Sequence, residues 1–125
     1  MTNKKGSKKL TIFLSEEELN LVKQDLKLRG VNTHDYIIAI LYNKYEYFKD
    51  LLECGFKRTT HYNKSIERNK KISLFINEED INMISELEEY HFNASQVVAD
   101  YLYESKEYIE YCIENDIDNY SDEII

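Results

Sequence analysis

The sequence predicts a mainly α-helical protein in which a short β-strand precedes two helices, and in which this unit occurs twice. Three observations predict this fold. A segment of thirteen residues that begins at Lys8 returns at Lys70, with six positions identical and the other seven of the same chemical class. Each copy alternates apolar and polar residues and then enters a helix-capping motif. Each copy continues into two stretches with apolar residues at helical spacing.

The composition bounds the class of protein. The chain has 125 residues, no proline and 42% hydrophobic residues, which fits one domain or two small halves that share a core. No apolar run approaches the roughly 18 residues that span a bilayer. The basic start of the chain precedes an apolar run that is too short for a signal peptide. We therefore expect a cytoplasmic protein without a membrane segment, with Cys54 and Cys112 as reduced, half-buried thiols.

The net charge of −8 is unevenly distributed. Residues 104–125 hold eight acids and one base, so the other 103 residues carry 15 bases and 16 acids. Two basic clusters lead into the repeated segments. They consist of Lys4, Lys5, Lys8 and Lys9, and of Lys57, Arg58, Lys64, Arg68, Lys70 and Lys71. This segregation leaves nucleic-acid binding open in spite of the acidic total.

The first expected element of each copy is a strand with two different faces. Residues at alternate positions of a strand lie on the same side of it. One side is aliphatic and carries Leu10, Ile12 and Leu14 in the first copy and Ile72, Leu74 and Ile76 in the second. The other side carries Lys9, Thr11 and Phe13 in the first copy and Lys71, Ser73 and Phe75 in the second.

The second expected element is a short helix. Ser15 with Glu18 forms a capping box, and Asn77 with Asp80 forms a weaker version of it. Acidic residues in both first turns suit the helix dipole. The apolar stripes are Leu19, Val22 and Leu26 in copy one, and Ile81, Ile84 and Leu87 in copy two. Gly30 ends the first helix, whereas copy two lacks this glycine and is one residue shorter.

The third expected element is a longer helix that begins after Asn32 in copy one and after Asn93 in copy two. Its stripe is Ile37, Ile40, Leu41, Phe48, Leu51 and Leu52 in copy one, and Val98, Tyr101, Leu102, Ile109 and Ile113 in copy two. Eight tyrosines crowd these helices, namely Tyr36, Tyr42, Tyr45, Tyr47, Tyr101, Tyr103, Tyr108 and Tyr111. Because they exceed one helix face, some rings must be exposed or must contact another molecule.

Strand, helix, tight turn and longer helix in about 45 residues resemble the ribbon-helix-helix family of DNA-binding proteins, which includes Arc, MetJ and CopG. The closest match is to the CopG/MetJ type, in which a basic and a small hydroxyl residue alternate with aliphatic ones. Here the matching residues are Lys9-Leu10-Thr11-Ile12 and Lys71-Ile72-Ser73-Leu74. The resemblance covers residues 8–55 and 70–116. It implies that the two strands form one antiparallel β-ribbon and that the chain is an intramolecular pseudo-dimer.

The remaining segments complete this division of the chain. Residues 1–7 form a basic arm, residues 56–69 a basic linker and residues 117–125 an acidic tail. A single chain that carries two copies of the ribbon-helix-helix unit resembles regulators and accessory factors of viruses and plasmids.

The resemblance also implies two kinds of DNA contact. The base-reading residues are the outward ones of the strands, namely Lys9, Thr11, Phe13, Lys71, Ser73 and Phe75. The family usually has a polar residue where Phe13 and Phe75 stand, so these rings either touch the groove, cover the ribbon edge or enter a protein interface. Phosphates are bound at the start of the longer helices and by flanking bases. These residues are Asn32, Thr33, His34, Asn93, Ala94, Ser95, Lys4, Lys5, Lys8 and Lys70, with Arg58, Lys64 and Arg68 as nonspecific partners.

The leading interpretation is a sequence-specific regulator of transcription, most simply a repressor, that inserts its ribbon into the major groove of double-stranded DNA. Alternatives are a plasmid DNA-processing accessory factor that uses the same ribbon, and a protein-interaction module such as an antitoxin. Self-association on DNA through the tyrosine-rich helices is a further expectation. We expect no enzymatic activity, no small-molecule substrate, and no cofactor or metal, because the three histidines lack metal-ligand spacing and nucleophile motifs are missing.

Overall fold

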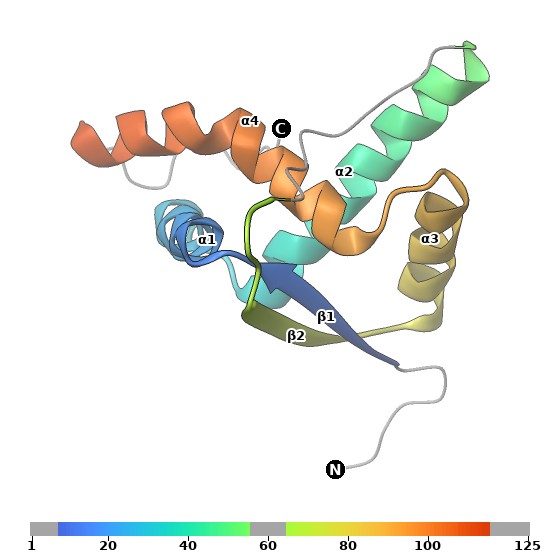
Figure 1. Ribbon diagram of the computed structural model, residues 1–125, viewed down its shortest axis with the longest axis horizontal. Coiled ribbons are helices and arrows are strands. Elements are labelled where there is room, and N and C mark those ends of the chain that lie inside the picture. Colours follow the sequence, from blue (N-terminus) through green and yellow to red (C-terminus); the bar gives the residue numbers. More distant parts are fainter. Residues whose placement is uncertain (1–7, 56–64, 116–125) are drawn as a thin grey trace.

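The computed structural model describes residues 8–55 and 65–115. Along these residues the elements are β1 (Lys8–Leu14), α1 (Glu16–Arg29), α2 (Thr33–Glu53), β2 (Lys70–Ile76), α3 (Glu78–Glu89) and α4 (Ala94–Glu114). The described part of the chain is mainly helical and has one antiparallel sheet of two strands, as the sequence predicts. This ribbon lies along one side of the molecule and the helices lie on the other side of it (Figure 1).

The predicted helix starts are confirmed. The Ser15 side chain accepts a hydrogen bond from the Glu18 amide, and the Glu18 carboxylate accepts one from the Ser15 amide in return. Asn77 and Asp80 form the same reciprocal pair at the start of α3. These bonds satisfy backbone amides that have no partner within the helix. Each strand therefore passes into its helix after a single residue.

The ends of α1 and α3 use the same left-handed backbone with different residues. Gly30 follows α1 with φ 70°, and its amide donates to the Leu26 carbonyl at 2.8 Å. His91 follows α3 with φ 75° and occupies the place where the sequence lacks a glycine. The Phe92 amide donates to the Leu87 carbonyl at 3.0 Å, which is the bond of a Schellman motif. The turn therefore forms without glycine and leaves a non-glycine residue at positive φ.

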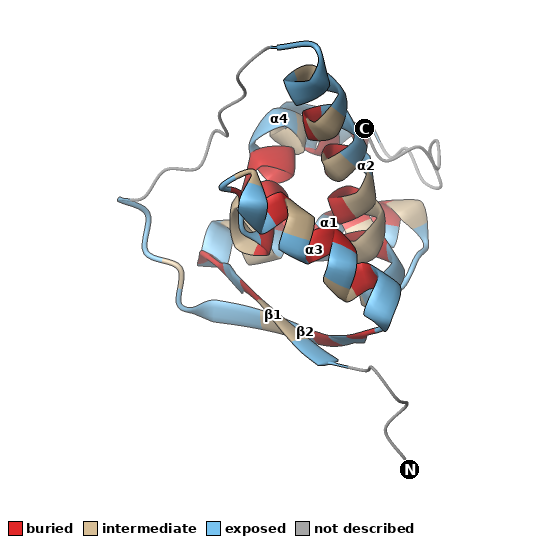
Figure 2. Cartoon of the chain, turned by 90° about the vertical axis from the view of Figure 1, so that its right-hand side faces the viewer, coloured by how far each residue is buried: buried red, intermediate tan, exposed pale blue. Residues whose placement is uncertain are grey.

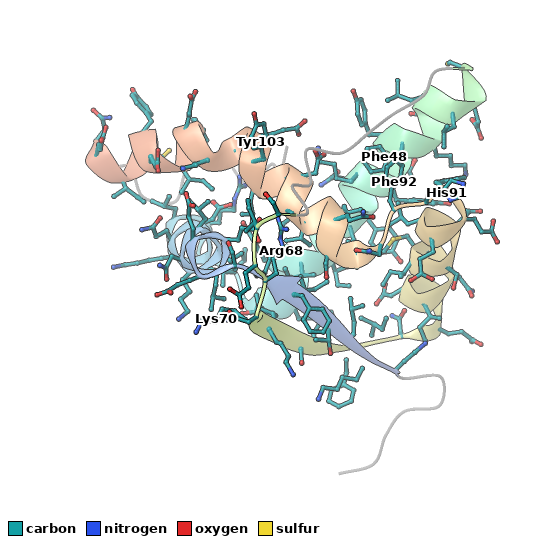
Figure 3. All side chains as sticks on the ribbon, viewed as in Figure 1. Phe48, Arg68, Lys70, His91, Phe92 and Tyr103 are labelled. Atoms are coloured by element: carbon teal, nitrogen blue, oxygen red, sulfur yellow. The ribbon has the colours of Figure 1, made fainter. Side chains whose placement is uncertain are left out.

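The aliphatic side of the ribbon faces the helices and forms one wall of the core. Ile12, Leu14, Leu74 and Ile76 are buried, and the outer side of the ribbon is exposed (Figure 2). Between the helices, the rings of Phe48 and Phe92 lie next to each other with centroids 4.5 Å apart (Figure 3). Most of the predicted helical stripes lie in this core. They include Val22, Ile37, Ile40, Leu41, Ile84, Leu87, Val98, Tyr101, Leu102 and Ile109.

Two members of the predicted stripes and both cysteines differ from expectation. Leu52 is exposed near the C-terminal end of α2, which points away from the C-terminal end of α4 (Figure 1). Ile113 is exposed on α4, where the neighbouring Cys112 takes the buried position. Cys112 is buried in the place expected for an apolar residue of α4, and Cys54 is exposed, so neither thiol is half-buried. No described helix is both long and apolar enough to cross a membrane.

A buried carboxylate joins α1 to both long helices. Asp25 is fully buried and accepts hydrogen bonds from the hydroxyls of Tyr36 at 2.7 Å and Tyr101 at 2.9 Å. Arg29 donates to the same carboxylate at 3.0 Å and to the Tyr101 hydroxyl at 3.2 Å. Burial, together with the negative charge of Asp25, raises the pKa of Tyr101 to about 12. Burial also raises the pKa of Tyr36 above its ordinary value. The network therefore keeps both tyrosines protonated.

A second buried polar group joins α2 to α4. The side chain of Lys44 is 4% exposed, and its ammonium lies 3.1 Å from the fully buried carboxylate of Asp100. Glu104, one turn further along α4, also binds this ammonium. Because an unpaired charge in this position would be costly, the pair fixes how the two long helices face each other.

Candidate nucleic-acid interface

The outer side of the ribbon gathers all six predicted base-reading residues on one surface. Lys9, Lys71, Ser73 and Phe75 are exposed, and so is Phe13, whereas Thr11 is half-buried. This alternation follows from the strand itself, since the neighbours on the inner side belong to the core. Neither strand contains an acidic residue. The surface is therefore a narrow strip of cations, hydroxyls and aromatic rings, which we call the outer strip.

The pairing register arranges the outer strip symmetrically. Thr11 of β1 lies opposite Ser73 of β2, which is its counterpart in the sequence repeat. Their hydroxyl oxygens are 3.5 Å apart, at the limit of a hydrogen bond. Lys9 lies opposite Phe75, and Phe13 lies opposite Lys71. A local two-fold axis through the Thr11–Ser73 pair thus relates the two lysine–phenylalanine pairs.

The start of α4 braces β1 directly. The Ser95 hydroxyl accepts a hydrogen bond from the Phe13 backbone amide at 2.9 Å. This amide points away from β2, so Ser95 satisfies a donor on the outer edge of the strand. The bond fixes the backbone of Phe13 while its ring stays 44% exposed. The strip is therefore held by a helix at this edge, in addition to its pairing with β2.

The first turn of α4 was expected to bind a phosphate, and only some of its predicted residues can offer a side chain for this. The side chain of Asn93 accepts from the Gln96 amide, and the Gln96 side chain accepts from the Asn93 amide, both at 2.9 Å. Ala94 is buried, so its side chain cannot reach a phosphate, and only its backbone amide is relevant. Ser95 keeps a hydroxyl proton to donate, because its oxygen acts as an acceptor toward Phe13. The first turn of α4 carries no acid.

The first turn of α2 differs in charge. Asn32 caps the helix by accepting from the Asp35 amide at 2.8 Å, as the sequence predicts for this residue. Thr33 is half-buried, and His34 is exposed with its Nδ1 3.2 Å from the Asp35 carboxylate. The Asp35 side chain is exposed and weakens the positive potential of this helix end for an anion. The two helix starts are thus unequal, and that of α4 suits a phosphate better.

The flanking bases divide into three groups. Lys8 and Lys70 are exposed at the two ends of the ribbon, and Figure 3 shows Lys70 at its end. Arg68 was expected to be a nonspecific partner of phosphates, and this expectation is wrong. Its guanidinium binds both oxygens of Glu18, at 2.9 and 2.7 Å, and its side chain is only 6% exposed. It therefore holds the segment before β2 on the start of α1 and is not available to a phosphate. Lys4, Lys5, Arg58 and Lys64 lie outside the described residues.

The eight tyrosines of the long helices divide as the sequence predicts into core and surface. Tyr36 and Tyr101 are buried, and Tyr42 and Tyr45 are half-buried with hydroxyls that donate to Asp80 and Glu86. The others are between 49% and 66% exposed, and Tyr103 projects from α4 into solvent (Figure 3). They are Tyr47, Tyr103, Tyr108 and Tyr111.

Sequence reasoning missed the buried polar network around Asp25 and the part that Ser95 plays in holding the outer strip. Asp25 lies in α1 at the place where the second copy has Leu87, and this difference between the copies is the signal that was present. Ser95 was predicted as a phosphate ligand, and its role as acceptor for the Phe13 amide needs the tertiary structure. The described residues contain no cluster of side chains that would hold a metal ion.

Comparison with models of protein families, with curated proteins and with solved structures gives no match.

Proposed function

We propose that this chain is a tandem ribbon-helix-helix protein that binds double-stranded DNA as a sequence-specific regulator of transcription, most simply as a repressor. The single observation that carries this proposal is the outer strip, an acid-free ribbon surface with two lysines and two hydroxyls. Support also comes from the order strand, helix, helix, which occurs twice with the two strands paired to each other. In this proposal the chain is a pseudo-dimer of its two halves.

A two-stranded ribbon matches the dimensions of the major groove of B-DNA. Lys9 and Lys71 are proposed to donate to the O6 and N7 atoms of guanine, and Thr11 and Ser73 to bond base edges between them. Since the two-fold axis relates threonine to serine, the preferred site is a pseudo-palindrome whose centre is not fully symmetric. Lys8, Lys70 and the start of α4 at Ser95 are the proposed phosphate contacts.

The two alternatives to a regulator of transcription are a DNA-processing accessory factor and a protein-binding module. An accessory factor that binds and bends DNA at an origin would use the same ribbon and the same residues. A protein-binding module, such as an antitoxin, is favoured by the exposed Tyr103, Tyr108, Tyr111 and Ile113 on α4. These rings also form the surface through which we propose that neighbouring copies associate on DNA.

The decisive experiment is selection of bound duplexes from a random pool at physiological salt. The wild type is compared with Lys9→Ala/Thr11→Ala/Lys71→Ala/Ser73→Ala, and with Lys23→Ala/Lys27→Ala as a control that removes two exposed lysines of α1. We expect the wild type and the control to enrich one motif and to bind it at about 10⁻⁸ M or tighter, and the quadruple variant to lose it. A wild type that enriches no motif would refute the regulator, and a search for a protein partner of α4 would follow.

A further inference from the structure

We infer that each lysine–phenylalanine pair of the outer strip recognises a thymine next to a guanine, and that Phe13 and Phe75 determine specificity by contacting the thymine 5-methyl group. The inference rests on the proposed function and adds to it the bases that the ribbon prefers. The departure from a polar residue at these two positions then has a chemical meaning.

The geometry places a cation and a ring side by side at both ends of the strip. Lys9 is the cross-strand partner of Phe75, and Lys71 is the partner of Phe13. The Phe13 amide donates to Ser95 and not to β2, so the pairs at these positions are of the non-hydrogen-bonded kind. In such pairs the Cβ atoms lie roughly 4.5–5.5 Å apart on the same side of the ribbon. The ammonium and the ring of one pair therefore reach neighbouring bases.

The exposure of both rings on the same face of the ribbon favours an apolar partner. Phe75 is 63% exposed and Phe13 is 44% exposed, although both stand on a rigid ribbon beside a well-packed core. The largest apolar group that the bases present in the major groove is the 5-methyl group of thymine. Guanine offers two acceptors there to the neighbouring lysine. A thymine and a guanine on adjacent steps satisfy both members of one pair.

The charge of the strip disfavours another copy of this ribbon as the partner of the rings. Two outer strips face to face would bring Lys9 and Lys71 of one copy against the same residues of the other, with no acid in either strand to compensate. DNA carries the opposite charge along both walls of its groove. Charge complementarity therefore favours the duplex as the molecule that covers Phe13 and Phe75.

The strand geometry also sets the spacing. Lys9 and Phe13 are four residues apart on β1, which corresponds to about 13 Å at roughly 3.3 Å per residue. This length equals about four steps of B-DNA at 3.4 Å each. We therefore expect two thymine–guanine elements in inverted orientation, with centres about four base pairs apart. The bases between them face Thr11 and Ser73.

The test replaces thymine by deoxyuridine in a duplex that the wild type has selected, which removes the methyl group and leaves the hydrogen-bonding edge unchanged. We expect a loss of affinity of about fourfold for each contacted methyl group, or about fifteenfold for two. Deoxyuridine outside the two elements should have no effect. Phe13→Ala/Phe75→Ala should bind the thymine and deoxyuridine duplexes equally, and Phe13→Leu/Phe75→Leu should keep part of the difference.

The outcomes separate the inference from the proposed function. Specific binding that is indifferent to deoxyuridine would overturn the methyl contact and leave the regulator intact. No specific binding to any duplex would overturn both. Since both rings are exposed, their replacement should leave the thermal unfolding transition unchanged. If the alanine variant nevertheless unfolds, the comparison of the two duplexes with the wild type alone decides the question.

Discussion

At the scale of the residue, the interior of this protein contains polar groups that are fully partnered. Asp25 accepts from two tyrosine hydroxyls and one guanidinium, and no apolar residue supplies such bonds. The second copy fills the corresponding place with the fully buried Leu87. The same position thus holds a charged, hydrogen-bonded residue in the first half and an aliphatic residue in the second.

This network makes stability sensitive to alkaline pH. The pKa of Tyr101 is raised to about 12, and that of Tyr36 is raised above its ordinary value, so the folded state holds protons that the unfolded state loses near pH 10. The stabilisation is complete below about pH 10 and is lost as the pH rises through the folded pKa values. We expect the urea midpoint to fall between about pH 10 and pH 12, together with the appearance of tyrosinate absorbance.

The matched variants are Tyr101→Phe and Tyr111→Phe. The first should be less stable at neutral pH and should show a weaker fall with rising pH, because one of the protons is gone. The second alters an exposed ring and should match the wild type. A midpoint that stays constant up to pH 12 in the wild type would contradict the argument.

His91 carries a backbone cost that glycine would relieve. At φ 75° a side chain crowds the backbone, and left-handed geometry costs roughly 1–2 kcal/mol for residues other than glycine. We expect His91→Gly to stabilise the protein by about 1 kcal/mol, and Gly30→Ala at φ 70° to destabilise it by about the same amount. Urea denaturation at neutral pH measures both. Ser85→Gly, an exposed site inside α3, should destabilise it, which separates the turn from a general effect of glycine.

At the scale of the element, the ribbon is attached to the helices by side chains near the strand ends. Ser95 reaches β1 from the start of α4, and Arg68 ties the residues before β2 to the capping box of α1. Both contacts combine a helix start with a strand end. They make the position of the outer strip depend on how the helices pack.

Arg68 should therefore affect stability without contributing to binding of DNA phosphates. We expect Arg68→Met to lower the free energy of unfolding by about 2 kcal/mol, since a charge-assisted pair with little exposure is lost. The slope of log K against log salt for a selected duplex should stay unchanged. In Lys8→Ala/Lys70→Ala the magnitude of this slope should fall by about 1 to 2, because counterion release scales with the number of neutralised phosphates. An equal change in both variants would show that Arg68 contacts the backbone of DNA.

The elements themselves were predictable because their signals are local. Alternation over seven residues sets each strand, and caps such as Ser15 with Glu18 set the helix starts within four residues. Arg68 was misassigned because its partner Glu18 lies 50 positions away, and a basic linker gives no sign of such a contact. Ile113 was misassigned because the C-terminal part of α4 turns Ile109 and Cys112 toward the core, and Ile113 lies beside this buried side of the helix. The outer strip was predicted in full, since strand alternation alone places its residues.

At the scale of the whole molecule, the first and second halves of the chain carry different buried residues. Each half therefore suits the other half better than it would suit a second copy of itself. In the proposed pseudo-dimer, a first half paired with another first half would bring Ile40 to the place of Tyr101. Lys44, which is buried against Asp100 and Glu104, would meet Ala39 and Asn43. An unpaired buried ammonium costs several kcal/mol.

We therefore expect residues 1–62 and residues 63–125, made as separate chains, to be poorly helical alone and to fold when mixed in equal amounts. Circular dichroism detects the gain of helix, and sedimentation should show a one-to-one complex. The same mixture with Lys44→Met in the first half should associate more weakly, because Asp100 then lacks its cation. A stable, helical dimer of either half alone would contradict this expectation.

Because β1 pairs with β2 inside one chain, assembly of the ribbon does not depend on how many copies of the protein are present. A ribbon made of two separate chains falls apart on dilution, so its abundance depends on the square of the subunit concentration when subunits are scarce. Here the second strand is always present at the effective concentration set by the linker. The outer strip is therefore complete even when only a few molecules are present. If the chain is the regulator that we propose, occupancy of a single unsaturated site rises in direct proportion to the number of copies made.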